Sequence, residues 1–72
     1  MKYTLIGVDG NAYAIMGYTA KAMRREGFSK EEIDKMYEEA KSGDYDNLLM
    51  VCMGYIDKAN EAAGEQEEDD EY

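Results

Sequence analysis

The chain has 72 residues, one Cys and no His, and its 17 Asp and Glu outnumber its 8 Lys and Arg, for a net charge of −9. A chain this short forms one domain with a thin core, and its composition excludes an intrachain disulfide and argues against a structural metal. The net charge opposes contact with phosphate and anionic lipid, so we expect no direct nucleic-acid binding and no membrane binding. The first residues lack the pattern of a signal peptide, and no apolar run approaches the roughly 20 residues that span a bilayer, so we expect a cytoplasmic protein.

Residues 2–8 are rich in β-branched and aromatic types and are followed by the turn signal Asp9-Gly10-Asn11. This pattern predicts one short N-terminal β-strand. The Asp-Gly pair is also a hairpin signal, which leaves residues 12–16 as either a second strand or the start of a helix. We favour the helix. A lone strand would leave its backbone N–H and C=O groups unpaired unless another edge met it.

A first helix is predicted between Asn11, a suitable N-cap, and Gly27, a suitable stop. Its core stripe recurs at intervals of three and four residues. The stripe consists of Ala12, Ile15, Met16, Thr19, Ala20 and Met23. Tyr13 and Tyr18 fall off this stripe, and tyrosine is frequent at interfaces. They are therefore candidate partner-binding residues, with partial burial against the strand as the alternative.

A second helix is predicted to begin at Ser29, which forms an S-x-x-E capping box with Glu32, with Phe28 and Ile33 in hydrophobic-staple positions. Gly43 is the predicted C-cap of this helix. The apolar stripe is Ile33, Met36, Tyr37 and Ala40. The opposite face is mostly acidic, which is typical of a solvated surface.

A third helix is predicted from Asp44, its N-cap, to about Ala63. Its core stripe is Tyr45, Leu48, Leu49, Cys52, Tyr55, Ile56 and Ala59. Cys52 is expected to be buried and unreactive. The same helix carries Met50, Val51 and Met53, so that residues 48–55 are apolar nearly all round. A surface helix should have a polar back, and we therefore predict that these three residues bind a partner.

Six of the acidic residues are concentrated near the C-terminus, at Glu65, Glu67, Glu68, Asp69, Asp70 and Glu71, which leaves −9 + 6 = −3 for the rest of the chain. We expect residues 64–72 to form an acidic disordered tail after a domain of residues 1–63. Solubility is the expected role of the tail, and mimicry of nucleic acid is the alternative. A basic patch at Lys21, Arg24 and Arg25 suits the end of the first helix, where the alternative role is to anchor an acidic partner.

The sequence shows no pattern typical of catalysis or cofactor binding. General acid–base chemistry uses His or carboxylates held in a dry cleft, and the carboxylates here fall on predicted exposed faces or in the tail. The segments Asp9-Gly10-Asn11 and Asp44-Tyr45-Asp46 lack the Gly and Glu that complete a calcium loop, and no Gly-rich nucleotide-binding motif is present. We expect a non-enzymatic protein without cofactors or metals.

Residues 5–12 read Leu-Ile-Gly-Val-Asp-Gly-Asn-Ala, residues 15–17 read Ile-Met-Gly, and residues 42–49 read Ser-Gly-Asp-Tyr-Asp-Asn-Leu-Leu. This pattern resembles a group of short hypothetical proteins from bacteria and their phages, for which no activity is known. The resemblance spans most of residues 3–60 and concerns turn, cap and core positions. It supports the architecture and implies no particular function.

The expected fold is mainly α, with one short N-terminal β-strand followed by a three-helix bundle. The leading functional hypothesis is a protein–protein interaction module that forms a homodimer or higher oligomer, burying Met50, Val51, Met53 or the strand edge of residues 3–8 between copies. By analogy with small acidic phage proteins, the partner could instead be a host protein that the chain inhibits. The alternative class is a small-ligand binding protein, with a pocket between the strand, Tyr13 and the third helix.

Overall fold

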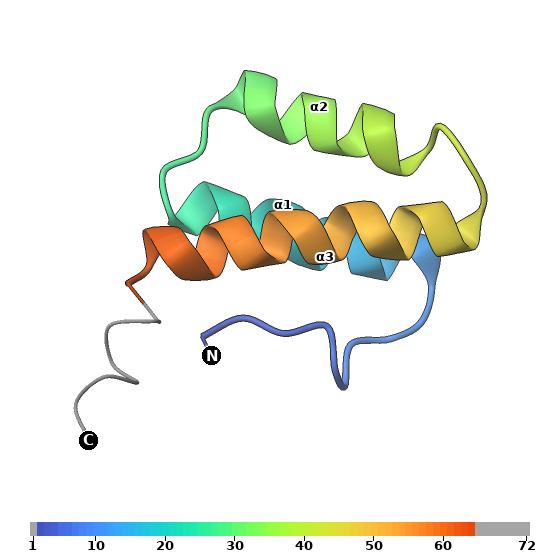
Figure 1. The fold of residues 1–72 in the computed structure, drawn as a ribbon, viewed down its shortest axis with the longest axis horizontal. Helices are drawn as coiled ribbons and strands as arrows, with labels where there is room; N and C mark the ends of the chain where they lie inside the picture. Colours follow the sequence, from blue (N-terminus) through green and yellow to red (C-terminus); the bar gives the residue numbers. More distant parts are fainter. Residues whose placement is uncertain (1, 65–72) are drawn as a thin grey trace.

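The computed structural model describes residues 2–64, which form three helices. Helix α1 is Ala12–Arg25, α2 is Lys30–Ala40 and α3 is Tyr45–Ala62, and each packs against the other two (Figure 1). The main core cluster contains Ile15, Met16, Ala20, Met23, Ile33, Met36, Ala40, Leu48 and Cys52. The helical prediction is confirmed, including residues 12–16, which lie in the first turns of α1 rather than in a second strand.

Local capping explains where each helix begins. The Asn11 side chain accepts hydrogen bonds from the N–H groups of Tyr13 and Ala14, and the Asp44 side chain accepts from the N–H of Asn47. Ser29 and Glu32 form the predicted capping box. All three predicted N-caps are confirmed.

The ends of α1 and α2 differ in how their last carbonyls are satisfied. After α1, Gly27 has a φ of 87°, and the Phe28 N–H donates to Met23 C=O while the Gly27 N–H donates to Arg24 C=O, which is a Schellman motif. The predicted C-cap role of Gly43 is wrong, because α2 ends at Ala40 with Lys41 as its C-cap, and Gly43 is not among the glycines with positive φ.

The side chain of Asn47, in the first turn of α3, takes the role expected of Gly43. Its Nδ2 donates to Glu39 C=O at 3.0 Å and to Ala40 C=O at 3.5 Å. A Cβ at Gly43 would lie 3.0 Å from the Asn47 Cβ, so the glycine provides the space for this cap. The carbonyl end of α2 is therefore satisfied by a neighbouring helix.

The predicted N-terminal β-strand is wrong, since residues 2–64 contain no strand. Leu5, Ile6, Gly7 and Val8 form a turn instead, in which the Val8 N–H donates to Leu5 C=O at 3.1 Å. Gly7, at the third position, has a φ of 87°, which fits a type II turn. The β-branched composition of the segment is overridden by the one residue that adopts this conformation without strain.

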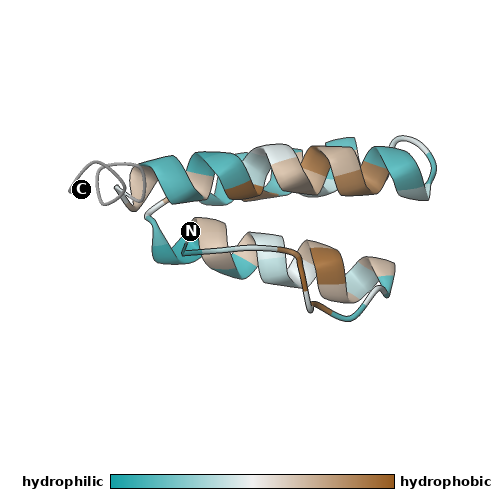
Figure 2. Ribbon diagram, turned by 60° about the horizontal axis from the view of Figure 1, so that its bottom comes forward, coloured by the Kyte–Doolittle hydropathy of each residue, from teal (hydrophilic) through white to brown (hydrophobic). Residues whose placement is uncertain are grey.

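Side chains from α1 and α3 bind the backbone of residues 3 and 4. The Tyr3 N–H donates to Asn60 Oδ1 at 2.8 Å, and Asn60 Nδ2 donates to Tyr3 C=O at 3.0 Å. The Thr4 N–H donates to the Tyr18 hydroxyl at 3.1 Å. The segment runs lengthwise along the helices as a coil (Figure 2), and these bonds attach it to both α1 and α3. The expectation of an unpaired strand edge in residues 3–8 is wrong at Tyr3 and Thr4, because the chain satisfies these groups itself.

The tyrosines of the second and third helices lie at the edge of the core. Tyr37 and Tyr55 are half-buried against it. Tyr45, which was predicted to lie in the core, is exposed, and its hydroxyl donates to Gly10 C=O. The acidic segment predicted over residues 64–72 lies outside the described residues, apart from Gly64.

Candidate functional site

An apolar groove lies between the N-terminal turn and α3. This surface, called the apolar groove below, has a volume of about 350 Å³. It is lined by Thr4, Leu5, Ile6, Met53, Ile56 and Asp57. Ile6 is 88% exposed and Met53 is 55% exposed. Exposed apolar side chains that gather at a concave surface are one mark of an interaction site.

The turn and its anchors position Ile6. Asn60 holds Tyr3 on one side, while Leu5 packs against the core beside it. The Ile6 N–H donates to Thr4 Oγ1 at 3.1 Å, which helps to define the start of the turn. Leu5 packs against the core, whereas Ile6 occupies the second position of the turn and is exposed at the rim of the groove.

Met50 and Val51, two of the three predicted partner-binding residues of α3, border a different hollow. That hollow lies between α2 and α3 and is lined by Lys35, Glu39, Met50, Val51, Gly54, Tyr55 and Lys58. Met50 is 73% exposed, whereas Val51 is partly buried against the core. The three residues predicted as one surface are therefore divided, and only Met53 joins the apolar groove.

Tyr55 defines the polar edge of the hollow beside Met50. Its hydroxyl donates to Glu39 Oε1 at 3.1 Å, and the Lys58 ammonium lies 4.9 Å from its ring centroid. Partial burial, and then the hydrogen bond to Glu39, raise the pKa of Tyr55. These polar contacts make the hollow a less apolar surface than the groove.

The two predicted partner-binding tyrosines of α1 have different environments. Tyr13 is 79% exposed in the first turn of α1 and lines neither hollow. Tyr18 is half-buried, and its hydroxyl accepts the Thr4 N–H. Tyr18 therefore holds the N-terminal segment in place, which agrees with the alternative of partial burial against that segment, although the segment is a coil and not a strand.

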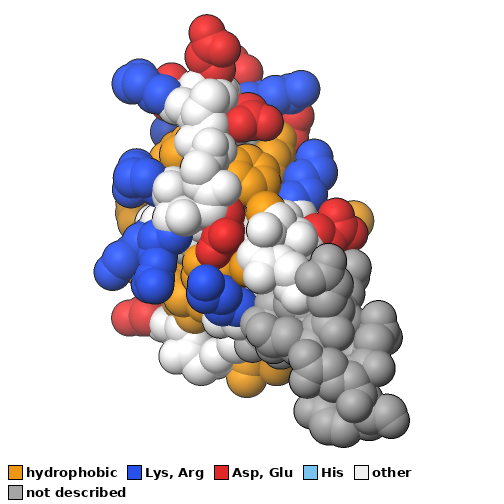
Figure 3. Space-filling model, turned by 90° about the vertical axis from the view of Figure 1, so that its left-hand side faces the viewer, with side chains coloured by type: hydrophobic (Ala, Val, Ile, Leu, Met, Phe, Trp, Pro, Cys, Tyr) orange, Lys and Arg blue, Asp and Glu red, His pale blue; other side chains and the backbone are white. Residues whose placement is uncertain are grey.

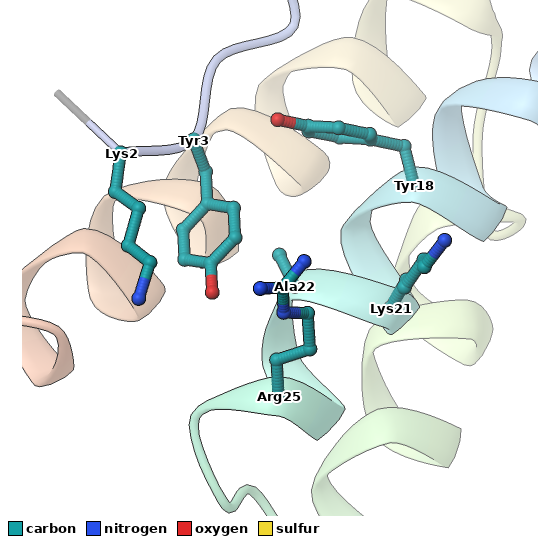
Figure 4. Close-up of a pocket in the computed structure, with 6 residues that line it drawn as sticks. All are labelled: Lys2, Tyr3, Tyr18, Lys21, Ala22 and Arg25. Carbon is teal, nitrogen blue, oxygen red and sulfur yellow. The ribbon is translucent and has the colours of Figure 1, made fainter.

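A second pocket lies on the other side of the N-terminal segment and is rich in cations. It is lined by Lys2, Tyr3, Tyr18, Lys21, Ala22 and Arg25, has a volume of about 290 Å³, and is called the basic pocket below (Figure 4). The predicted patch of Lys21, Arg24 and Arg25 is divided, because Arg24 lines a different hollow beside α2 and Lys2 takes its place.

Glu26 contacts two residues of the basic pocket, Tyr3 and Lys2. Its carboxylate accepts a hydrogen bond from the Tyr3 hydroxyl and pairs with Lys2 Nζ at 3.4 Å. The hydrogen bond from Tyr3 holds the pKa of Glu26 below its ordinary value, and the charge of Lys2 acts in the same direction. The same hydrogen bond, with burial, raises the pKa of Tyr3. The side chain of Tyr3 is thus held at both its ring and its hydroxyl.

Cys52 lies in the centre of the core, fully buried as predicted. Burial raises the pKa of its thiol, and a hydrogen bond with Thr19 opposes this shift. A thiol in this setting is protonated at neutral pH and packs as a small apolar side chain.

Within residues 2–64, no three Cys, Asp or Glu side chains lie close enough together to hold a metal ion. None of the helices over the same range is both long and apolar enough to cross a membrane. Comparison of the chain with protein-family models, with curated proteins and with solved structures found no match.

Sequence reasoning missed Asn60 as a positioning residue, and it included Ile6 only within the strand edge of residues 3–8, without singling out its side chain. Ile6 reads as an inward or outward position of a strand, and only Gly7 beside it signals the turn that exposes it. Asn60 is a buried polar residue that follows Ile56 and Ala59 on the core stripe of α3. A polar side chain on an apolar stripe is a usable signal, because a buried amide needs partners.

Proposed function

We propose that this chain is a non-enzymatic protein–protein interaction module that binds a second copy of itself through the apolar groove. The observation that carries the proposal is the exposure of Ile6 at 88% beside Met53 at 55%, over a hollow with apolar walls. A partner that covers this surface removes both side chains from water.

The expected strength of the interaction follows from the burial of these side chains. Full burial of one Ile or Met side chain contributes about 1.5–3 kcal/mol. In a symmetric pair, the free energy gained by burying Ile6 and Met53 of both copies would approach the roughly 4–15 kcal/mol that association costs. That cost comes from lost translational and rotational freedom and from ordering of side chains. A dimer that forms at micromolar concentration needs a net free energy of about −8 kcal/mol, so the other residues that line the groove must also be covered by the partner.

A second copy fits this surface because the groove combines a protrusion with a hollow. A two-fold interface uses the same patch on both subunits, so the patch must be complementary to itself. Ile6 projects at the rim, and the space between Leu5 and Ile56 lies beside it. Only one charged residue, Asp57, lines the groove, so two facing copies bring few like charges together.

The test is sedimentation equilibrium of the full chain from low micromolar to high micromolar concentration. We expect the average mass to rise from the 8.2 kDa of one chain toward twice that value. Ile6→Asp and Met53→Glu should keep the mass at that of one chain. Met50→Glu is the matched control, because it changes an even more exposed Met on the same helix that lies outside the groove.

Two results would overturn the proposal. One is a wild-type chain that stays monomeric over the whole concentration range. The other is loss of association in Met50→Glu but not in Met53→Glu, which would place the contact on the hollow between α2 and α3. Circular dichroism of each variant checks that the helices are intact.

A small apolar ligand is the second candidate occupant. The volume of about 350 Å³ lies near the lower end of the roughly 300–1,000 Å³ of ligand pockets. The groove lies between the N-terminal segment and α3, as expected for a ligand pocket, but Tyr13 does not line it. A ligand would raise the melting temperature by an amount that grows with the logarithm of its concentration above Kd, and Met53→Glu should abolish that rise. A metabolite screen that leaves the melting temperature unchanged would count against this candidate.

A further inference from the structure

We propose that the acidic segment of this same chain, residues 65–72, docks onto the basic pocket between the N-terminal segment and α1. This contact is separate from the apolar groove, and either one can exist without the other. The proposal rests on the charge of the pocket, on where α3 ends, and on the length and charge of the chain that follows.

The pocket gathers three cations from two parts of the chain. Lys21 and Arg25 are exposed on α1, and Lys2 comes from the N-terminal segment. Figure 4 shows Lys2 and Arg25 on either side of the Tyr3 ring. Within residues 2–64, the only carboxylate paired with this group is Glu26, which contacts Lys2. Within the same residues neither Lys21 nor Arg25 forms a direct ion pair, although the charge of Arg25 also acts on Glu26, so both cations can take a further anionic partner.

The acidic segment begins next to this pocket. Ala63, which follows the last residue of α3, packs against the cluster of Tyr3, Ala22, Ile56 and Ala59. Tyr3 and Ala22 also line the basic pocket, so the chain leaves α3 beside the wall of the pocket. Eight residues in extended form reach up to about 27 Å, whereas Tyr18 to Arg25 spans only about 10 Å of helix. The segment is therefore long enough to cover the cations.

Charge selects the basic pocket over other surfaces near the end of α3. Residues 65–72 carry six carboxylates, and they follow the negative end of the α3 dipole, whose last turn contains no basic residue. The last turn of α1 carries Arg24 and Arg25, and Figure 3, which views this end of the molecule, shows Lys and Arg side chains gathered on it. The segment is repelled by the end of α3 and attracted to α1.

Tethering gives the segment an advantage over free anions. A short linker holds a ligand at an effective concentration in the millimolar range. Exposed ion pairs are individually weak and are screened by salt, so the docked state should depend on ionic strength. An external acidic ligand must displace the segment before it can use the pocket, and the segment thus acts as a built-in competitor.

The test compares backbone amide NMR spectra of two full-length chains at low salt. The first is the wild type, and the second has its six C-terminal acids replaced by amides. The replacements are Glu65→Gln, Glu67→Gln, Glu68→Gln, Asp69→Asn, Asp70→Asn and Glu71→Gln. We expect shift differences within residues 2–64 to be largest at residues 2–4 and 18–25, and to vanish near 1 M salt, where the screening length is about 3 Å.

Two double variants identify the site, and each is made both in the wild type and in the chain with the six amides. Lys21→Gln with Arg25→Gln should remove most of the shift difference. Lys35→Gln with Lys41→Gln is the matched control, because it removes the same charge from exposed positions in and just after α2 and should leave the difference in place.

Three results would overturn the proposal. The first is the absence of shift differences within residues 2–64 at low salt, and the second is differences centred on α2 or on the apolar groove. The third is a difference that grows with protein concentration, which would mean that the segment contacts another copy. The oligomer measurements on Ile6 and Met53 variants are made separately, so failure of the groove proposal and failure of this one are distinguishable.

Discussion

Tyr3 and Ile6 lie three residues apart in the same apolar segment and have opposite environments. Tyr3 is 5% exposed and packs against α1 and α3, whereas Ile6 is 88% exposed. Their sequence neighbourhoods are similar, since both belong to the β-rich stretch of residues 2–8. The difference arises because Tyr3 has polar partners on distant helices, while Ile6 sits in a turn that directs it outward.

This contrast shows how a chain can hold an extended segment without a sheet. Asn60 supplies one acceptor and one donor to Tyr3, in the manner of a neighbouring strand. The two residues are 57 positions apart. The hydrogen bonds from helix side chains to this segment's backbone end at Thr4, and the turn that follows forms one wall of the apolar groove.

The largest loss of stability is expected when the buried ring of Tyr3 is removed. Tyr3→Ala should lower the free energy of unfolding by about 3–5 kcal/mol, because it empties a buried aromatic site between Ala22, Ile56 and Ala59. Tyr3→Phe is the control, since it keeps the ring and should cost only about 1 kcal/mol for the hydroxyl. Urea unfolding followed by circular dichroism measures both. Equal costs for the two variants would show that the ring is not the anchor.

The next largest loss of stability is expected at Asn60, whose side-chain amide bonds the backbone of Tyr3. Asn60→Leu should cost about 2–4 kcal/mol, because it leaves the buried N–H and C=O of Tyr3 without partners. Asn11→Ala removes a local helix cap and should cost about 1 kcal/mol by comparison. A cost for Asn60→Leu no larger than that for Asn11→Ala would show that the N-terminal segment is not held by Asn60.

A smaller effect concerns the pH dependence of stability. The pKa of Glu26 is lowered by the Tyr3 hydrogen bond, so this contribution is fully present above the ordinary value of 4.5 and is lost as pH falls through the lower folded pKa. The urea midpoint of the wild type should therefore fall more steeply below pH 4.5 than that of Tyr3→Phe. The remaining carboxylates are common to both chains and cancel in the comparison. Parallel pH profiles would contradict the role given to this hydrogen bond.

The smallest expected effect is at the exposed end of the segment. Ile6→Ala should change the free energy of unfolding by no more than about 0.5 kcal/mol when measured on dilute, monomeric protein. The side chain has little contact to lose, since most of it faces solvent. A cost above about 1 kcal/mol would mean that Ile6 is packed within its own chain, which would also remove the main support for the groove as a binding surface.

The parts of the fold that were predicted correctly depend on interactions within a few residues. The N-caps at Asn11, Ser29 and Asp44 bond to groups two or three residues away, and the core stripes follow helical spacing. The predicted strand failed because one glycine with positive φ and a distant Asn outweighed β propensity. The predicted C-cap at Gly43 failed for a related reason, since Asn47 of the next helix bonds the last carbonyls of α2.

The candidate surfaces, like the fold, were predicted only in part from the sequence. The sequence singled out Met53 as apolar beyond the needs of the core and the cluster around Lys21 as basic. It did not reveal that Met53 lines one groove with Ile6, that Met50 faces a separate hollow, or that Lys2 replaces Arg24 in the basic pocket. Each of these facts requires knowing which way the N-terminal segment crosses the helices.

The sequence alone determined that the described chain is helical, where each helix begins, and that α3 carries more apolar surface than one helix face can bury. These features depend on capping, periodicity and composition, which act over a few residues. Only the tertiary structure decided the path of residues 2–8, and with it the positions of the groove and the basic pocket. That path is set by hydrogen bonds and packing between residues far apart in the chain, and such contacts leave no periodic signal in the sequence.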